Sequence, residues 1–468
     1  MAQRPRFLSS LRLVIFSLVI YSSLVFVLQG IAWGEKPKGE RTVLSLPELI
    51  DRAIAKSPEI GETQSDIRSA QSDLAQVQAA YYPQLETTAL IGPVEDAKEP
   101  LIVNGRITDP SPAIGASTIG IFGRLDLTMT QPLYTFGKLS NRKEAASRGV
   151  RAKEFQLDEK RAQVALRVKQ LYYALILARA GVETANEAGD FFAEARRRIQ
   201  RLLELGSANA RESDLFRIDA YRADSLRFKA EAEKGARVSY FALKSLIHLP
   251  PDVEFDPADK TLSMKEEVPA GLESYIQKAA DGRPEFKQLA EALAAQESQV
   301  KAATSDRYPS FFAALKGSLA DAPGRETMYN RYIRDDFNHA YIGVVGGIKW
   351  NFDFGISRAK VDKMMAEYDK LLHTKASAEM NIPIQVAKSY LEHLEWREAA
   401  TSYLTAASAS RKWVFTALAD FDMGVGTADE MLRAIEKYGQ NRGKYLESLF
   451  RTNLSLAELE YAVGVITR

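Results

Sequence analysis

The chain repeats one structural plan twice, and this duplication constrains its fold more than any other feature of the sequence. A shift of 226 residues aligns the first part of each copy without a gap, and a shift of 218 residues aligns the rest. The aligned pairs include Leu46 with Leu272, Pro58-Glu59 with Pro284-Glu285, Tyr82-Pro83 with Tyr308-Pro309, Phe136-Gly137 with Phe354-Gly355, Gly206 with Gly424, and Glu212 with Glu430. Copies of about 200 residues are too long to be solenoid repeats, so we expect two related halves, over 35–248 and 272–468.

Each copy changes from helical periodicity to strand periodicity and back. In the first copy apolar residues recur every three or four positions over 58–81, which predicts a helix that Tyr82-Pro83 ends. Apolar and polar residues then alternate over 84–134, and the second copy repeats this alternation over 310–354. Each of these stretches is therefore predicted to form a strand hairpin with one apolar face.

The apolar faces of the hairpins decide where the sheet can lie. Their residues are Ile119, Ile121, Leu125, Leu127 and Met129 in the first copy, and Ile342, Val344 and Ile348 in the second. A soluble protein would pack this face on its core, whereas a membrane barrel would turn it toward lipid. The strands alone fit both arrangements.

The helices after the hairpins are more decisive, because they are much longer than those of globular domains. No proline interrupts 138–205, and seven apolar residues recur there seven positions apart, from Leu157 to Ile199. At 1.5 Å per residue such a helix is roughly 100 Å long. The matching helix over 357–423 has a less regular heptad and contains Pro383, which predicts a kink or a neighbour that covers the freed carbonyl group.

Each long helix stops at a short break, after which a second helix is predicted over 209–248 or 427–465. Gly206 and Gly424 suit the left-handed position that follows a helix end. The two copies should therefore end in equivalent helical hairpins. Between the copies, the proline-rich stretch 249–271 is predicted to be a linker.

The second helix of each hairpin has a candidate N-terminal cap. Asn209 precedes Glu212 by three residues, and Thr427 precedes Glu430 by three residues. This is the spacing of an N-cap residue and the acid that completes a capping box. The break in each hairpin is therefore predicted to end at Asn209 and at Thr427.

The first 34 residues have the pattern of a secretory signal. Three arginines precede or begin an uncharged run from Leu13 to Gly34, and Ala32-Trp33-Gly34 offers a cleavage site. The alternative is an uncleaved membrane anchor, because the run approaches spanning length. No later apolar run is long enough for a transmembrane helix, and without cysteine the chain cannot carry a thioether-linked lipid. Any membrane attachment of the mature protein must then come from its folded part.

The composition argues against enzymes, metal proteins and nucleic-acid binders. With 62 Lys and Arg against 61 Asp and Glu, the formal net charge of +1 gives no field that would concentrate nucleic acid. The absence of cysteine excludes disulfides and thiolate-bound metals, and the four histidines lie too far apart for a close metal-ligand motif. No nucleotide-binding loop or serine nucleophile elbow follows a strand. We expect no catalytic residues, no metal and no cofactor.

The order of these features resembles the TolC-like outer membrane efflux protein family. The resemblance is carried by the signal, the doubled plan, the glycine-centred tips, and the run Gln131-Pro132-Leu133-Tyr134-Thr135-Phe136-Gly137 at the first strand-to-helix junction. It covers residues 44–466. The second junction, Trp350 to Gly355, is one residue shorter and lacks the proline, so its strand register stays open.

The resemblance implies a mixed α and β membrane protein. Three copies would each give four strands to one β-barrel in the outer membrane, and their helices would form a long coiled-coil tunnel in the periplasm. The implied partners are outer membrane lipid, a periplasmic adaptor protein and an inner-membrane pump. The leading hypothesis is thus a passive exit duct of a tripartite efflux pump or a type I secretion system. Backbone hydrogen bonding also favours assembly. Lipid cannot hydrogen-bond the unpaired N–H and C=O groups at the two open edges of a four-stranded sheet.

Two groups of tip residues follow from the same resemblance. Adaptor contact is expected at Gly206, Ser207, Ala208, Gly424, Val425, Gly426 and Thr427, although the glycines could serve only as helix ends. A periplasmic gate is expected at Glu212, Glu430 and Arg433, with a contact between Arg433 and Glu212 of a neighbouring helix pair. Both acids could equally be no more than capping residues.

A second hypothesis comes from another class of protein. A secreted coiled-coil scaffold or adaptor would have the same helices but a soluble sheet. The two hypotheses differ at the row from Ile119 to Met129, which a barrel places in lipid and a scaffold packs on protein.

Overall fold

The two compact units into which the chain divides are very unequal in size. A computed structural model describes residues 42–98, 101–108, 119–207, 209–264, 270–327 and 335–465. The predicted signal over 1–34 lies outside these residues. In the smaller unit β1 (Thr42–Leu44) pairs in parallel with β6 (Phe255–Pro257), so the predicted linker contains a strand.

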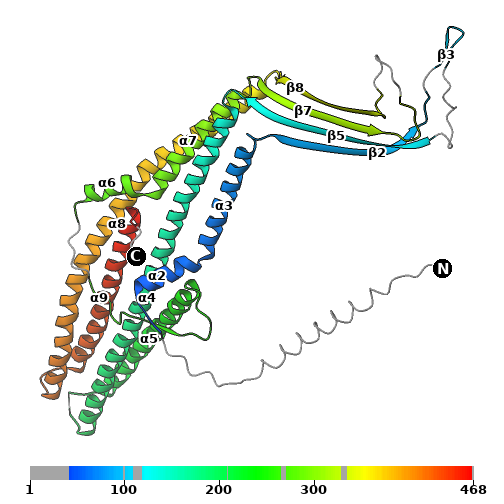
Figure 1. Cartoon of the computed structure of the whole chain (residues 1–468). Helices are drawn as coiled ribbons and strands as arrows, with labels where there is room; N and C mark the ends of the chain where they lie inside the picture. The colour runs from blue at the N-terminus through cyan, green and yellow to red at the C-terminus, as the bar shows by residue number, and fades with distance from the viewer. Residues whose placement is uncertain are drawn as a thin grey trace, which may run out of the picture. The chain divides into compact units, whose positions relative to one another are not determined.

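The larger unit contains a series of elements that occurs twice (Figure 1). The first series is α2 (Leu46–Lys56), α3 (Pro58–Ala79), β2 (Gln84–Glu95), β5 (Ile119–Tyr134), α4 (Lys138–Glu204) and α5 (Glu212–Leu246). The second is α6 (Leu272–Gly282), α7 (Pro284–Ser305), β7 (Ser310–Asp321), β8 (His339–Lys349), α8 (Ile356–Asp422) and α9 (Ala428–Ala462). Corresponding helices have equal lengths of 11, 22, 67 and 35 residues. The first series also holds a small hairpin of β3 (Leu101–Val103) and β4 (Arg106–Thr108).

The helices before the hairpins begin at the same feature in both series. Pro58 and Pro284 occupy the first turn of α3 and α7, where a missing N–H breaks no helical bond and the fixed φ suits the helix. α3 ends at Ala79, two residues before its predicted end, because the chain turns there and the Tyr82 N–H donates to the Ala79 carbonyl.

The long helix α8 continues through Pro383. On either side of the proline, Ile382 and Val386 are buried in a cluster with Leu459 and Ala462 of α9. Packing on α9 therefore holds the turns that flank the missing hydrogen bond.

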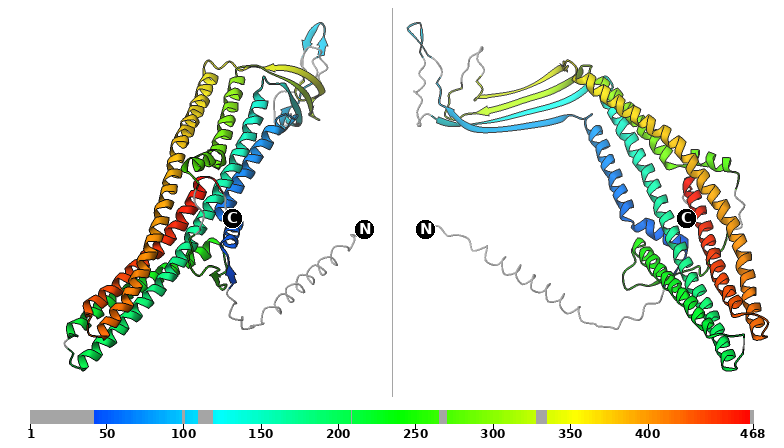
Figure 2. Two further views of the ribbon diagram at one scale, coloured as in Figure 1. Left: turned by 90° about the vertical axis from the view of Figure 1, so that its left-hand side faces the viewer. Right: turned by 180° about the vertical axis from the view of Figure 1, so that it is seen from behind.

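The helices of the larger unit form a layer extended by two hairpins. α3, α4, α7 and α8 pack side by side in that order, while α5 packs on α4 and α9 packs on α8 (Figure 2). One core joins the two hairpins near their tips. Its fully buried members include Ile199 of α4, Ile218 of α5, Phe421 of α8 and Met431 of α9.

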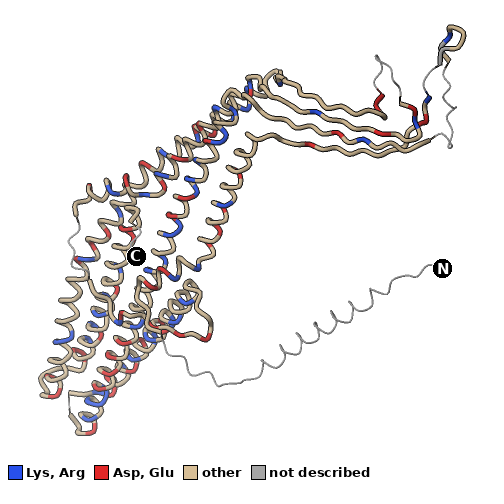
Figure 3. Tube along the Cα trace, viewed as in Figure 1, with Lys and Arg blue, Asp and Glu red and all other residues tan. Residues whose placement is uncertain are grey.

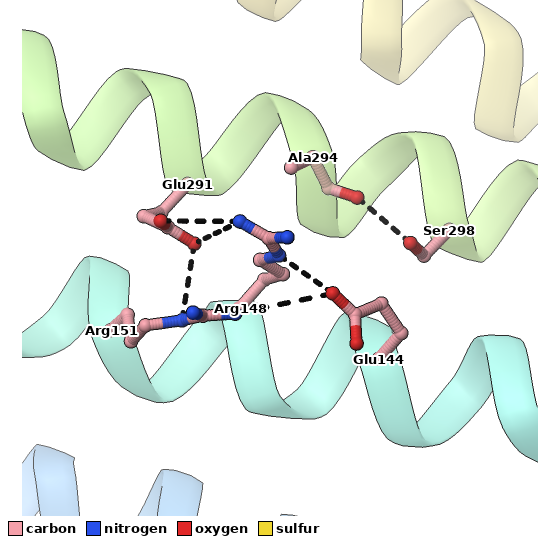
Figure 4. Close-up of polar contacts among 6 residues, drawn as sticks. All are labelled: Glu144, Arg148, Arg151, Glu291, Ala294 and Ser298. Atoms are coloured by element: carbon pink, nitrogen blue, oxygen red, sulfur yellow. Dashed lines mark hydrogen bonds and ion pairs between the residues drawn. The ribbon is translucent and has the colours of Figure 1, made fainter.

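Charged side chains also join the two series between α4 and α7 (Figure 4). Glu291 of α7 lies 3.2 Å from Arg148 Nη1 and 3.3 Å from Arg151 Nε, and Arg148 Nε lies 2.7 Å from Glu144. The hydrogen bonds to Glu144 and Glu291 raise the pKa of Arg148, and the bond from Arg148 lowers the pKa of Glu144. These contacts help to fix the middle of the helical layer.

Four strands form one antiparallel sheet in the order β2-β5-β7-β8. A bulge between Pro132 and Tyr134 shifts the register at the end of β5. β7 and β8 pair in regular register up to Ser310 with Lys349, so the second hairpin, predicted over 310–354, ends at Lys349 and the junction from Trp350 to Gly355 lies beyond the last strand pair. Within the described residues β2 and β8 each have one neighbouring strand, so each leaves one edge unpaired.

Candidate functional site

The four-stranded sheet has one apolar face. The register places Leu125 of β5 between Ala89 of β2 and Leu319 of β7, and it pairs Leu315 of β7 with Val344 of β8. The eight predicted apolar-face residues all lie on this side, and all are exposed, with Val344 at 76%. In one copy of the chain nothing within the described ranges covers this face.

The register places Arg124, Asp126 and Thr128 of β5 on the opposite face, with Lys316 and Ser318 of β7. Charges are sparse along the strands compared with the helices (Figure 3). Arg124 Nε lies 2.8 Å from Asp126 Oδ2. Ser318 Oγ lies 2.6 Å from Asp126 Oδ1 and 2.7 Å from His339 Nε2. Polar side chains thus link three strands on one face of the sheet. The alternation of apolar and polar residues could not predict this cluster, because alternation does not reveal which strands are neighbours.

Exposed aromatic rings continue the apolar row past the end of β8. Trp350, Phe352 and Phe354 alternate in the sequence with Asn351 and Asp353, and all three rings are exposed. The ring centroids of Trp350 and Phe352 are 4.7 Å apart. Aromatic residues at the border of an apolar band are typical of the boundary between lipid and water.

The two strand-to-helix corners have the same backbone conformation. Phe136 and Phe354 have φ values of 50° and 49°, and each is followed by a glycine with positive φ, Gly137 or Gly355. A left-handed conformation is uncommon for a phenylalanine. The glycine of each pair suits its own positive φ, and the corner conformation is the same in the two copies.

Both hairpin tips end their long helix in the predicted left-handed glycine. Gly206 has φ of 68° and Gly424 has φ of 77°. The Ser207 N–H donates to the Leu202 carbonyl at 2.9 Å, which with the Gly206 bond to Leu203 makes a Schellman motif. The equivalent motif in the second tip joins Val425 to Asp420 and Gly424 to Phe421. The glycines therefore serve as helix ends, whatever else they do.

The remaining tip residues are largely open to contact. Val425 is 77% exposed, and Ser207, which holds the equivalent position in the first tip, is half-buried. Gly426 packs closely, because a Cβ there would lie 3.0 Å from the Asp420 and Phe421 backbone. Ala208 lies outside the described residues.

The predicted cap of the first tip is wrong, and that of the second is confirmed. Thr427 caps α9, since its Oγ accepts from the Glu430 N–H at 3.2 Å. In the first tip α5 begins only at Glu212, with Arg211 as the N-cap residue. Asn209 instead turns across to the other hairpin, where its Nδ2 donates to the Gly424 carbonyl at 2.9 Å.

The three predicted gate residues are all exposed near the tips, but no contact within one chain joins Arg433 to Glu212. Arg433 Nη2 lies 2.8 Å from Asp429 Oδ2, one turn earlier on α9. Asp429 also pairs with Arg217 of α5. The Arg217 hydrogen bond, reinforced by the charge of Arg433, lowers the pKa of Asp429 despite opposing desolvation.

Further polar contacts tie the two hairpins together, and sequence spacing gave no indication of them. Arg198 of α4 donates to the Leu418 carbonyl of α8 at 3.0 Å and pairs with Asp422. Glu187 of α4 lies 3.2 Å from Arg411 of α8 and accepts from the Tyr438 hydroxyl of α9. Burial, together with this hydrogen bond, raises the pKa of Tyr438 to about 12, so its phenol keeps its proton at neutral pH.

No helix in the described ranges combines the length and the apolar character needed to cross a membrane. Within the same ranges, no three His, Asp or Glu side chains gather in a way that could hold a metal ion.

Comparison with known families gives a match in each half of the chain. The family described as outer membrane efflux protein matches residues 49–234 and 275–465. The two matched segments correspond to the two series of elements. A comparison with curated proteins gives no match.

Several solved structures share the fold. The outer-membrane channel OprN superposes with a TM-score of 0.74 at 17% identity, covering 90% of this chain and 89% of that one. VceC, an outer membrane protein from Vibrio cholerae, gives 0.71 at 16% identity, covering 90% and 96%. The open state of the MtrE outer membrane channel from Neisseria gonorrhoeae gives 0.71 at 17% identity, covering 90% and 88%. At these identities the likeness establishes the fold alone.

Proposed function

Because the chain belongs to the outer membrane efflux protein family, we propose that it forms the outer-membrane exit duct of a tripartite efflux pump or type I secretion system. The duct is passive and is powered by an inner-membrane partner. Its β-sheet lies in the outer membrane and its helices extend into the periplasm. The observation that carries this proposal is the sheet, with one exposed apolar face and one polar face.

The sheet can span lipid only as part of an assembly. Its edges at β2 and β8 carry backbone N–H and C=O groups that lipid cannot hydrogen-bond. Joining β8 of one copy to β2 of the next satisfies both edges when the ring closes. We propose a homotrimer with a barrel of twelve strands, which is the arrangement that the family resemblance implies.

In this assembly the apolar row faces lipid and the polar face lines the passage. The row includes Leu125 and Val344, and the aromatic rings from Trp350 to Phe354 lie at the periplasmic border of the membrane. The polar face carries Asp126, Ser318 and His339, whose side chains bond to one another. The proposal thus assigns each face of the sheet a solvent that fits its chemistry.

The helical tips form the other functional end. We propose that Ser207, Val425 and the residues beside them contact a periplasmic adaptor protein, since they form the turns at the far end of the hairpins, where Val425 is exposed and Ser207 is half-buried. Glu212, Glu430 and Arg433 surround the same end and are proposed to line the periplasmic mouth. In a trimer each acid would occur three times around the axis and concentrate negative potential.

Conductance in planar bilayers tests the duct. Purified full-length protein inserted from detergent should give discrete single-channel currents that favour cations. A matched preparation of Leu125→Asp, which places a charge on the lipid face, should insert rarely. Absence of currents from the unmodified protein, under conditions in which it inserts into the bilayer, would contradict a passive duct.

A further inference from the structure

An open cleft lies where the sheet meets the helical layer. It has two neighbouring lobes, of about 360 Å³ and about 430 Å³, and Arg142, Asp306 and Lys360 line both. Each lobe falls within the size range of small-molecule sites, which is roughly 300 to 1,000 Å³. The first lobe is bordered by the sheet ends, and the second extends between α3, α4, α7 and α8.

The lobe next to the sheet is cationic. Asp306 holds two ammonium groups, with Lys138 Nζ at 2.5 Å and Lys360 Nζ at 3.2 Å. Arg142 and Lys349 also line this lobe, and neither forms an ion pair with any described residue. The lobe therefore has two cations held in place and two available to a ligand.

The second carboxylate of this lobe is already occupied. Asp353 accepts from the Ser357 N–H at 3.0 Å and also from the Ser357 hydroxyl, which together fix the first turn of α8. An anion entering the lobe would therefore meet positive charge that neither carboxylate neutralises.

The second lobe is mostly apolar. Its lining consists of Ala70, Asp73, Val77, Arg142, Ala145, Ala146, Gly149, Gln299, Ala302, Ala303, Asp306, Lys360 and Met364. A Cβ added at Gly149 would meet no heavy atom within 4 Å, so the lobe is open there. An alkyl chain or ring can lie in this space without displacing a side chain.

The cleft opens on the same side as the polar face of the sheet. Ser310 and Lys349 are paired across β7 and β8, and both line the first lobe. By alternation they share their face with Lys316 and Ser318 rather than with the apolar row. The polar face is the one that the proposed duct turns toward its passage.

We propose that this cleft is a cargo-binding site on the wall of the passage, for amphipathic molecules that carry a sulfate, phosphate or carboxylate group. The anionic group binds Arg142 and Lys349, and the apolar part lies along the alanine-lined lobe. This inference rests on the proposed function, because only in a duct does this face line the path of cargo.

Calorimetric titration of the full chain in phosphatidylcholine nanodiscs tests the site directly, and this lipid supplies no competing anionic headgroup. Two submicellar probes share one tail: octyl sulfate is anionic and octyl glucoside is neutral. Octyl sulfate should bind saturably, and octyl glucoside should bind at least tenfold more weakly. Arg142→Gln combined with Lys349→Gln should weaken octyl sulfate about tenfold, which corresponds to about 1.4 kcal/mol.

Two control variants distinguish loss of the binding site from a general effect of substituting a glycine or removing a positive charge on α4. Gly149→Leu fills the apolar lobe and should weaken octyl sulfate binding, whereas Gly189→Leu, at an equally open position of α4 away from the cleft, should not. Lys143→Gln removes a cation beside Arg142 that does not line the cleft, and it should leave binding unchanged.

Single-channel currents from the same preparations distinguish the two proposals. Saturable binding with the expected variant pattern supports the binding site. If such binding is found without single-channel currents, the binding site stands and the proposed duct is contradicted. Currents without saturable octyl sulfate binding overturn the site and leave the duct standing. Binding that Arg142→Gln with Lys349→Gln and Gly149→Leu both leave unchanged also overturns it.

Discussion

At the scale of single residues, Asp429 is one of the points where oppositely charged side chains join the two hairpins. It pairs with Arg217 of the other hairpin and with Arg433 of its own helix. Because these partners lower its pKa from an ordinary value of 3.8, their stabilisation is fully present above about pH 4 and is lost only as the pH falls through the lowered value. Hydrogen exchange at 205–214 should therefore show equal protection at pH 7 and pH 5, after correction for intrinsic rates.

The variant Asp429→Asn removes this charge at every pH. Exchange at 205–214 should become faster in the variant at both pH values. A wild-type tip that loses protection between pH 7 and pH 5 would mean that another group governs the contact.

Arg433 gives a second prediction at this scale. Arg433→Glu places a carboxylate beside Asp429, and their repulsion should loosen the tip and raise single-channel conductance. Arg451→Glu is the matched control, because Arg451 lies on the same helix beside Glu447 and far from the tip. Glu430→Gln should lower cation selectivity. Unchanged conductance in Arg433→Glu together with unchanged selectivity in Glu430→Gln would remove both residues from the gate.

Local sequence chemistry predicted some of these residues well and others not at all. The Thr427 cap and the two left-handed glycines depend only on their own turn of chain, and they are found as predicted. Asn209 has the right spacing for a cap but bonds to Gly424, which is distant in sequence. The pairing of Arg217 with Asp429 likewise depends on how the hairpins pack, and spacing along one helix carries no such information.

At the scale of elements, the two faces of the sheet lead to a direct test. Leu125→Asp and Val344→Asp each place a charge on the apolar face and should block membrane assembly. A lipid-facing charge costs up to about 2 to 4 kcal/mol near the bilayer centre, and less for Asp than for Lys or Arg. Thr128→Asp lies on the opposite face of β5, where it pairs with Lys316, and it should be tolerated.

The measurement is the amount of each variant recovered in the outer membrane fraction. Equal recovery of all three variants would show that the two faces of the sheet are assigned wrongly.

The hairpin tips provide the test of partner contact. A photocrosslinking amino acid at Ser207 or Val425 should capture a periplasmic adaptor in cells that make the whole pump, since both positions lie in the tip turns and neither is buried. The same amino acid at Ser239, which is buried in the C-terminal part of α5, is the control and should capture none. Capture from neither tip position would leave the tips with only their role as helix ends.

Element lengths were more predictable than element pairing. The long helices begin and end within one residue of the predicted bounds, because each follows a Phe-Gly corner and stops before a left-handed glycine. The strand in 249–271 was missed, since a three-residue strand between prolines has no periodicity. The strand order β2-β5-β7-β8 and the cleft at Arg142 and Lys349 follow from long-range contacts that hydropathy patterns do not encode.

At the scale of the whole molecule, the account depends on assembly. Two related halves give four strands with two unpaired edges, and the apolar row on the sheet has no cover among the described residues. When copies close into a ring within lipid, the strand edges pair with one another and lipid covers the apolar row. A single soluble copy would leave the edges unpaired and the apolar row exposed to water. Membrane location and oligomeric state are therefore tested together.

The most direct test is therefore to fractionate cells that express the chain and to run the protein on a detergent gel without heating. The account predicts that it is found in the outer membrane, migrates as a trimer when unheated, and migrates as a single chain after boiling. A soluble protein that migrates as a monomer under both conditions would contradict the exit duct.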